Sequence, residues 1–121
     1  MSHRVLVVDD EPNIVISLEY LLKKEGYVVA VAGDGEAALQ QAEQFLPDLV
    51  LLDVMMPKKS GFEVCETIRA NPALAGVKIV MLTARGRETE VTKGLALGAD
   101  AYITKPFSTK DLVARVKTLL G

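Results

Sequence analysis

Short apolar runs recur at five places along this chain, and they constrain its fold more than any other feature. They lie at residues 5–8, 28–31, 49–52, 77–82 and 101–103. An apolar run that does not alternate with polar residues is typical of a strand covered on both faces, as in a parallel sheet. Apolar residues recur at helical spacing between the runs, as Ile14, Leu18 and Leu22 do. Strands alternating with helices predict right-handed βαβ units and a doubly wound α/β fold.

The predicted helices differ in how well the sequence supports them. Ser60 and Glu63 have the spacing of a capping box at the start of the third helix. The fourth helix, at 88–97, has the weakest pattern, because Val91 and Leu95 form almost its whole apolar face. We therefore expect this helix to be held by few buried contacts.

Composition excludes several classes of protein. The chain has 121 residues, half of them hydrophobic, and a net charge of −2, which fits one compact domain over residues 1–121. The charge balance argues against nonspecific nucleic-acid binding by this domain, and no apolar run is long enough for a membrane span. A single cysteine, Cys65, rules out an internal disulfide and fits a reducing cytoplasm. A single histidine, His3, excludes a His-rich metal site and a Ser-His-Asp triad.

Polar side chains that could take part in catalysis or ligand binding follow four of the five predicted strands. The first strand is followed by Asp9 and Asp10, the third by Asp53, the fourth by Thr83 and the fifth by Lys105. The second strand is followed by an alanine and a glycine, to which we assign no chemistry. In open α/β sheets ligands bind at the carboxyl ends of the strands, so we expect these residues to converge in one cleft.

Such a set of residues fits phosphoryl transfer. Three crowded carboxylates repel one another unless a hard cation such as Mg²⁺ neutralises them. Asp53 is the candidate nucleophile, Asp9 and Asp10 are candidate metal ligands, and Lys105 with Thr83 would contact the phosphoryl oxygens. Taken singly, each has a simpler interpretation: the acidic pair as helix N-terminal charge, Thr83 as a helix cap, and Lys105 as a solvated loop residue. Their joint placement at strand ends favours the phosphoryl-transfer hypothesis.

At these residues the chain resembles the receiver domain of two-component response regulators, in the CheY-like superfamily. The matching motifs are Val7-Val8-Asp9-Asp10-Glu11-Pro12, Asp53-Val54-Met55-Met56-Pro57, Gly61, Thr83-Ala84, Gly98-Ala99-Asp100 and Tyr102-Ile103-Thr104-Lys105-Pro106-Phe107. Each motif is short, but their order and spacing together are specific. The resemblance implies a flavodoxin-like (βα)5 fold, a five-stranded parallel sheet in the order 2-1-3-4-5 with helices on both faces.

The resemblance also implies a role for each matching residue. Asp53 would take a phosphoryl group from a phosphohistidine of a sensor histidine kinase or phosphotransfer domain. Asp10 and Asp53 would bind Mg²⁺ (or Mn²⁺) directly, Asp9 through water, and Met55 through its backbone carbonyl. Lys105 would contact the phosphoryl group, and the peptide bond that follows it would be cis.

Thr83 and Tyr102 would form the switch pair that reads out phosphorylation. The threonine hydroxyl would move to the new oxyanion, and the tyrosine ring would turn inward into the space it leaves. The face formed by the fourth helix, fifth strand and fifth helix would then control an output domain or effector protein. Whether the receiver stands alone or precedes further domains is left open by this reasoning, as are the cognate kinase, the output and the phosphoryl lifetime.

One departure from the family bears on dimer formation. Receivers of winged-helix transcription regulators often carry an aspartate where this chain has Ala101, and pair it with an arginine matching Arg115 across a dimer. Ala101 cannot form that pair. A phosphorylation-dependent homodimer would need other ion pairs, for which Lys93, Asp100, Asp111 and Arg115 are candidates.

Three other functions were weighed. A phosphohydrolase of the haloacid-dehalogenase type needs a second aspartate two residues after the nucleophile, and this chain has Met55 there. A nucleotide- or flavin-binding module needs a glycine-rich phosphate loop, of which Gly33 and Gly35 are too small a part. A receiver that no longer accepts phosphate normally loses an acidic residue or the lysine, and this chain keeps them all. We therefore expect a signalling protein that catalyses only its own phosphorylation and dephosphorylation.

Overall fold

The computed structural model describes residues 3–56, 58–84 and 88–121. Five strands within these ranges form one sheet: β1 (Arg4–Val8), β2 (Val28–Ala32), β3 (Leu49–Asp53), β4 (Lys78–Ala84) and β5 (Ala101–Lys105). The helices alternate with them: α1 (Pro12–Lys24), α2 (Gly35–Phe45), α3 (Gly61–Ala70), the short 3-10 helix η1 (Pro72–Leu74), α4 (Glu88–Ala96) and α5 (Thr109–Leu120). None of these helices is long and apolar enough to span a bilayer.

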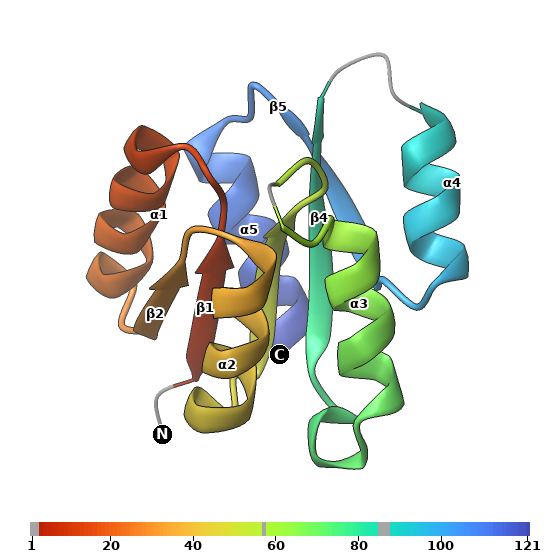
Figure 1. Ribbon diagram of the computed structural model, residues 1–121. Helices are drawn as coiled ribbons and strands as arrows, with labels where there is room; N and C mark the ends of the chain where they lie inside the picture. The colour runs from red at the N-terminus through yellow and green to blue at the C-terminus, as the bar shows by residue number, and fades with distance from the viewer. Residues whose placement is uncertain (1–2, 57, 85–87) are drawn as a thin grey trace.

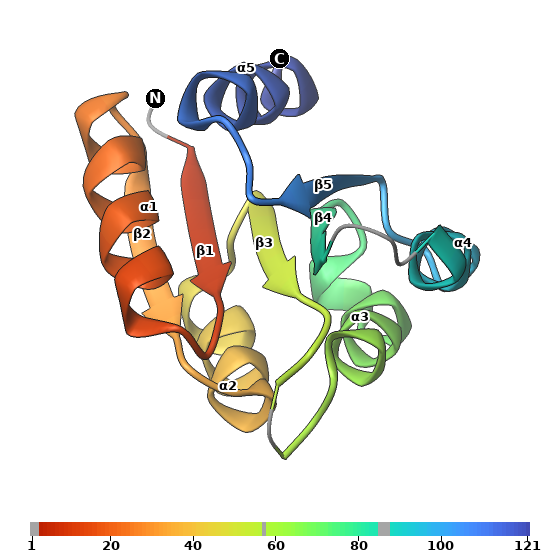
Figure 2. The ribbon, with the colours of Figure 1, turned by 90° about the horizontal axis from the view of Figure 1, so that it is seen from above.

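The strands pair in parallel in the order β2-β1-β3-β4-β5, which confirms the predicted topology (Figure 1). Successive residues of a strand point to opposite faces of the sheet. Leu6 and Val8 pack with the apolar sides of α2 and α3, whereas Val5 and Val7 pack with those of α1 and α5. Seen from above, the sheet lies between these two layers of helices, and α4 stands beside β4 and β5 (Figure 2). Burial on both faces explains the apolar runs of the inner strands β1, β3 and β4, whereas the outer strands β2 and β5 are mostly half-buried.

Three strands extend one residue beyond the expected runs at one end, and β4 and β5 differ by more. The predicted run at 77–82 begins one residue early and ends two residues early, because β4 continues through Thr83 and Ala84. These two residues pair with Thr104 and Lys105, which lengthens β5 beyond the predicted 101–103. The backbone ladder continues here after the apolar run has ended. Thr83 is therefore a strand residue, and its interpretation as a helix cap is wrong.

The ends of the helices follow local rules of the chain. Ser60 accepts from the backbone N–H of Glu63, whose side chain accepts from Ser60 in return, so the predicted capping box is confirmed. Gly98 follows α4 with a φ of 110°, in the left-handed region that favours glycine.

The fourth helix packs differently from the expectation. Leu95, which we assigned to its apolar face, is 44% exposed, and Val91 is half-buried. Gly94 is buried instead, and a Cβ at this position would lie 3.3 Å from Cγ of Met81 on β4. The helix therefore approaches the sheet through a residue without a side chain, which a pattern of apolar side chains cannot reveal.

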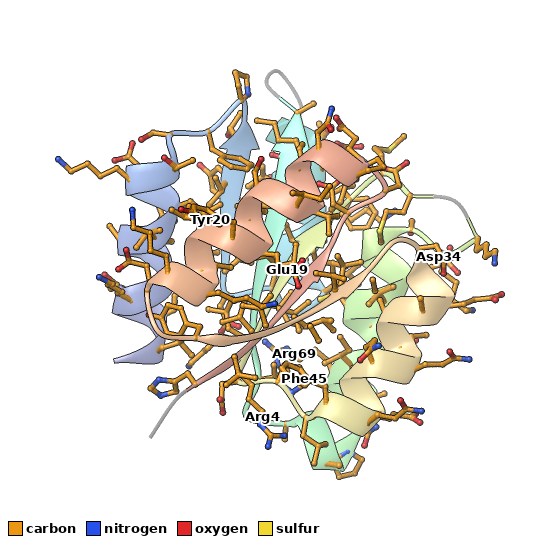
Figure 3. The ribbon with its side chains drawn as sticks, turned by 90° about the vertical axis from the view of Figure 1, so that its left-hand side faces the viewer. Arg4, Glu19, Tyr20, Asp34, Phe45 and Arg69 are labelled. Atoms are coloured by element: carbon orange, nitrogen blue, oxygen red, sulfur yellow. The ribbon has the colours of Figure 1, made fainter. Side chains whose placement is uncertain are left out.

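Contacts of Arg4, at the amino ends of the strands, fix the start of β1. The backbone N–H of Arg4 donates to Asp48 over 2.7 Å, and its guanidinium donates to the carbonyl of Phe45 over 2.7 Å. The guanidinium also lies 5.6 Å from the centre of the Phe45 ring (Figure 3). These contacts join β1 to α2 and the loop after it. They fix the start of β1, and Asp9 follows the other end of the same strand.

Candidate functional site

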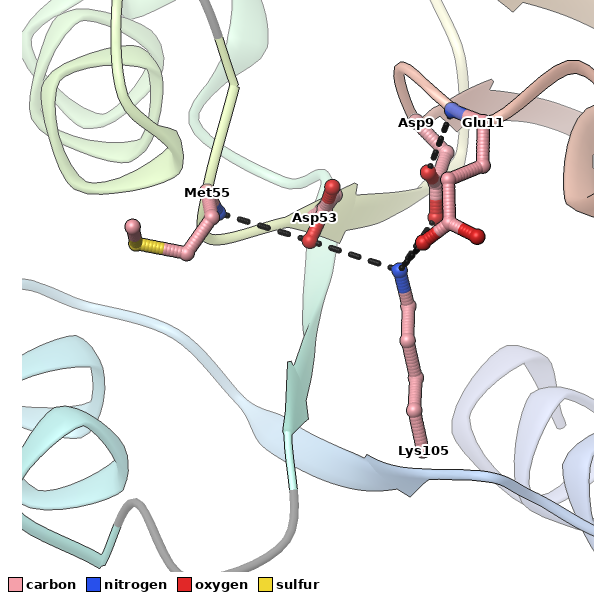
Figure 4. Close-up of polar contacts among 5 residues, drawn as sticks. All are labelled: Asp9, Glu11, Asp53, Met55 and Lys105. Carbon is pink, nitrogen blue, oxygen red and sulfur yellow. Dashed lines mark hydrogen bonds and ion pairs between the residues drawn. The ribbon is translucent and has the colours of Figure 1, made fainter.

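Charged side chains meet where the carboxyl ends of β1, β3 and β5 reach one edge of the sheet. Asp9 follows β1 directly, Asp53 is the last residue of β3, and Lys105 is the last residue of β5. The pairing of Val8 with Leu52 sets β1 and β3 side by side, so Asp9 and Asp53 reach the same level. The three side chains point toward one another (Figure 4). The predicted convergence of these strand ends is confirmed.

An acidic cluster forms the centre of this site. One carboxylate oxygen each from Asp9, Asp10 and Asp53 lies within 4.8 Å of the other two. Asp9 and Asp53 are buried, with 1% and 6% of their surface exposed, and Asp10 is exposed. Backbone N–H groups hold the buried pair: Glu11 donates to Asp9 over 2.9 Å, and Met55 donates to Asp53 over 3.4 Å. The cluster therefore has an inner, fixed part and an outer side open to solvent.

Lys105 is the cation of the site. Its Nζ lies 2.8 Å from Oδ2 of Asp9 and 3.5 Å from Oδ1 of Asp53. Burial of the ammonium opposes its charge, but the hydrogen bond to Asp9 and the charges of Asp53, Asp9 and Glu11 outweigh it, so the pKa of Lys105 is raised. Lys105 is therefore a charged participant in the site, and its interpretation as a solvated loop residue does not fit this geometry.

The carboxyl group of Asp53 is less acidic than an ordinary aspartate. Burial of the side chain, followed by repulsion from Asp9, raises its pKa from 3.8 to about 7. The charge of Lys105 and the N–H of Met55 act in the opposite direction but do not cancel the increase. Negative charge is therefore in excess at this point of the site.

The same residues fit a hard divalent cation. The donor atoms are carboxylate oxygens, which Mg²⁺ prefers, and three carboxylates face the single ammonium of Lys105, which alone cannot neutralise them. Asp9, Asp10 and Asp53 would hold the ion. The role of the Met55 carbonyl as a further ligand stays a prediction.

Glu11 is a member of the site to which sequence reasoning gave no role. Its Oε1 lies 3.5 Å from Nζ of Lys105, while its side chain is 62% exposed. Its position directly after the two aspartates, at the N-cap of α1, is the signal that could have identified it. Glu11 adds a third carboxylate around the lysine on the solvent side.

The predicted switch pair lies on neighbouring strands. Thr83 on β4 is buried, with 2% of its surface exposed, and Tyr102 on β5 is 42% exposed. Tyr102 pairs with Met81, two residues before Thr83 on β4. The peptide bond between Lys105 and Pro106 is cis, as the resemblance implied. The two residues thus lie on neighbouring strands, two register positions apart, and their movement stays a prediction.

Two residues that we named as partners for a dimer are already engaged within the chain. Asp100 forms an ion pair with Arg69, with 2.7 Å between Nη2 and Oδ2, and also accepts from the backbone N–H of Ile79. Lys93 lies over the ring of Phe62, 4.5 Å from its centre. An intermolecular ion pair of Asp100 would therefore compete with Arg69, and the dimer contacts stay a prediction.

Arg115 also has a contact within the chain. Its Nη1 donates to the backbone carbonyl of Tyr102 over 3.4 Å. This contact is long and exposed, so it constrains the guanidinium little. Arg115 and the exposed Asp111 are the members of the predicted set that an intermolecular pair could still use.

Comparison with known proteins gives the same family for the whole chain. The family model of the response regulator receiver domain matches residues 5–117. Two curated relatives are the alkaline phosphatase synthesis transcriptional regulatory protein PhoP of Bacillus subtilis (strain 168), 50% identical, and the DNA-binding response regulator MtrA of Mycolicibacterium smegmatis, 48% identical. Each alignment covers 99% of this chain but 49% and 51% of the relative, so the chain spans about half the length of these proteins.

A solved structure supports the assignment. The chemotaxis response regulator CheY4 of Vibrio cholerae superposes with a TM-score of 0.93 at 31% identity, over 98% of this chain and 99% of that one. The fold, the acidic site and the match over residues 5–117 agree with one another. The chain belongs to the family of response regulator receiver domains.

Proposed function

We propose that Asp53 accepts a phosphoryl group from a phosphohistidine of a sensor histidine kinase or phosphotransfer domain, in a Mg²⁺-dependent reaction. Membership of the receiver family implies signalling based on phosphorylation. The observation that carries the choice of residue is the position of Asp53: a buried carboxylate at a strand end, 3.5 Å from the ammonium of Lys105. Asp9 and Asp10 complete the acidic pocket in which receiver domains bind Mg²⁺.

The transfer exchanges one bond to phosphorus for another. An oxygen of Asp53 forms the new O–P bond, the P–N bond of the phosphohistidine breaks, and the imidazole leaves with that electron pair and takes up a proton from solvent. Lys105, 3.5 Å from Asp53, lies where it can pair with a phosphoryl oxygen and offset the added negative charge. A bound Mg²⁺ supplies further positive charge beside the phosphoryl oxygens. The chain itself therefore has to hold the nucleophile and Lys105 in place.

Loss of the phosphoryl group is a separate step, in which a water oxygen forms the new O–P bond, the bond between phosphorus and Asp53 breaks, and inorganic phosphate leaves. The side chain of Met55, which stands where a haloacid-dehalogenase phosphatase has its general acid, is 58% exposed and cannot donate a proton. We therefore infer that hydrolysis is slow compared with a dedicated phosphatase, and that the phosphorylated form persists as a signal.

We propose that phosphorylation of Asp53 changes the conformation of Thr83 and Tyr102, and that this change alters the face formed by α4, β5 and α5. Phosphorylation adds charge and acceptor oxygens at Asp53, which shifts a fold between two arrangements. Two observations support this surface: α4 packs on β4 through the small Gly94, and a depression of about 330 Å³ beside β5 is lined by Tyr102 and Arg115 among others. A helix held by few large side chains costs little to move.

The output that we propose is a DNA-binding module. The two curated relatives are named a transcriptional regulatory protein and a DNA-binding response regulator, and the chain aligns with about half of each. Such a module would lie in the same polypeptide or in a separate one, and the receiver would control it without contacting DNA itself. A phosphorylation-dependent homodimer would use Arg115 and Asp111, since Ala101 cannot form the ion pair common in that class.

The direct test is intact-mass measurement after incubation with acetyl phosphate and Mg²⁺. We expect the wild-type chain to gain one phosphoryl group, Asp53→Asn to gain none, and excess EDTA to stop the reaction. Asp111→Asn, which removes an exposed aspartate outside the site, is the matched control and should be labelled like the wild type. Equal labelling of Asp53→Asn and wild type would overturn the assignment of the acceptor. Labelling that persists in EDTA would overturn the metal requirement.

A further inference from the structure

The loop after β2 contacts the loop that follows the acceptor, although sequence reasoning assigned it no chemistry. Gly35, the first residue of α2, lies against the backbone of Lys59. A Cβ built on Gly35 would lie 3.0 Å from the carbonyl carbon of Lys59, and closer still to its carbonyl oxygen and its Cβ. No side chain fits there without a shift of one of the two loops.

Backbone conformation does not explain the glycine. Gly35 has a φ outside the left-handed region, so any residue could adopt its conformation. The first position of a helix has no preference for glycine either. The absence of a side chain at this position therefore serves the close approach between the two loops.

Asp34 reinforces the same contact. Its Oδ1 accepts from the backbone N–H of Ala37 over 2.8 Å and so caps α2, while Oδ2 lies 3.7 Å from Nζ of Lys58. Asp34 stands at the N-terminal end of α2 (Figure 3). The ion pair is long and Lys58 is largely exposed, so we assign it little energy and attribute the fixed position of the loop chiefly to Gly35.

The loop that follows the acceptor Asp53, which we call the acceptor loop, is also held where it meets the first residue of α3. The backbone N–H of Gly61 donates to the carbonyl of Val54 over 2.9 Å, and a Cβ on Gly61 would lie 2.9 Å from Cα of Val54. Val54 in turn donates to the carbonyl of Leu82 on β4 over 3.2 Å. Met55 lies between these anchors, directly after Val54, and its N–H contacts Asp53. A displacement at Lys59 would therefore be transmitted to Gly61, two residues further along the chain, and through its contact with Val54 to Met55.

We propose that Gly35 is a positioning residue for the phosphorylation site: its contact with Lys59 sets the acceptor loop, and with it the Met55 backbone, at the distance from Asp53 that Mg²⁺ binding requires. This inference rests on the proposed function. It adds the loop after β2, the one strand end without reactive side chains, to the machinery of the site.

Gly35→Ala tests the contact, and Gly33→Ala is its matched control. Gly33 lies two residues earlier in the same loop, and a Cβ there meets nothing within 4 Å. The readout is the rate of labelling by acetyl phosphate as a function of Mg²⁺ concentration. We expect Gly35→Ala to need roughly tenfold more Mg²⁺ for half-maximal rate, as for the loss of an outer partner of a metal ligand, and Gly33→Ala to stay within about twofold of wild type.

This readout separates positioning from a general loss of stability. A variant that is only less stable raises the Mg²⁺ concentration for half-maximal rate by no more than the inverse of its folded fraction, so a variant that circular dichroism shows to be at least nine-tenths folded should shift by only about 1.1-fold. A folded Gly35→Ala with the wild-type Mg²⁺ dependence would overturn the inference. An unlabelled wild type would instead overturn the proposed function, so the two failures are distinguishable.

A double variant covers the case in which Gly35→Ala does not fold. Lys59→Gly removes the Cβ that the new methyl group would meet, which relieves part of the clash, but the Lys59 carbonyl group stays in contact with the methyl group. We expect Gly35→Ala with Lys59→Gly to fold and to need several-fold more Mg²⁺ for half-maximal labelling than Lys59→Gly alone. A folded double variant with the same Mg²⁺ dependence as Lys59→Gly alone would overturn the inference.

Discussion

Removing the charge of Asp53 should stabilise the metal-free protein, because the folded state disfavours that charge. The pKa of Asp53 is 3.8 in an unperturbed chain and about 7 in the fold. Each pKa unit corresponds to about 1.4 kcal/mol, so the ionised carboxylate costs the folded state about 4 kcal/mol above pH 7. Asp53→Asn keeps the shape of the side chain and removes this cost. We expect the variant to be more stable by about 2–4 kcal/mol near pH 8, the lower figure allowing for an imperfectly bonded amide.

The difference in stability between Asp53→Asn and wild type should depend on pH, because the pKa of Asp53 differs between the folded and unfolded states. Below the unfolded pKa of 3.8 the carboxyl group is protonated in both states and contributes nothing. As the pH rises from 3.8 toward 7, only the unfolded state loses the proton, so the wild type loses stability relative to Asp53→Asn. The difference should therefore fall by about 2 kcal/mol between pH 8 and pH 5, to about 0–2 kcal/mol.

Urea denaturation of both proteins in EDTA, at the two pH values, measures this difference. Glu43→Gln, which removes an exposed charge on α2, is the control and should shift stability by less than about 0.5 kcal/mol. Mg²⁺ should stabilise the wild type more than Asp53→Asn and so reduce the gap. Equal stability of Asp53→Asn and wild type near pH 8, or a difference that does not change with pH, would refute the electrostatic account of the site.

Two further perturbations follow from the contacts of the structure. Lys105→Met should lower the maximal labelling rate roughly a hundredfold, because the phosphoryl oxygens lose a charged partner while Mg²⁺ still binds. A time course of labelling by intact-mass measurement checks this. A rate within about threefold of wild type would contradict it. Arg69→Gln should cost about 2 kcal/mol of unfolding free energy, since it removes the hydrogen bonds from the guanidinium to the carbonyls of Gly98 and Val77 and the ion pair with Asp100; urea denaturation measures the loss, and unchanged stability would contradict it.

The strand ends could be predicted from sequence because the physics there is local. An apolar run buried on both faces has to end where the chain meets solvent, and Asp9 and Asp53 mark those points. Parallel pairing then places all carboxyl ends on one edge, so the site followed from the order of the strands.

Features that depend on long-range contacts escaped the sequence pattern. The position of α4 depends on the buried Gly94, which adds nothing to a pattern of apolar side chains, whereas the more obvious Leu95 is exposed. The continuation of β4 through Thr83 requires pairing with Thr104, a residue that only the folded sheet brings beside it. The approach of Gly35 to Lys59 is of the same kind.

Electrostatic partners were also only partly predictable. Sequence reasoning placed Lys105 beside a future phosphoryl group, and the fold shows that it is held by Asp9 at 2.8 Å. Which of several nearby carboxylates a lysine pairs with depends on distances in the fold, and the spacing of residues in the sequence does not give these distances. For the same reason Asp100 was assigned to an intermolecular pair, although Arg69 in the same chain binds it.

The most direct test of the account is to locate the phosphoryl group on the chain. After labelling with acetyl phosphate and Mg²⁺, the protein is digested and its peptides are sequenced by mass spectrometry under acidic conditions that preserve acyl phosphates. The account predicts one modified peptide, with the phosphoryl group on Asp53. Modification at any other residue in the wild-type protein, with Asp53 unmodified, would contradict it.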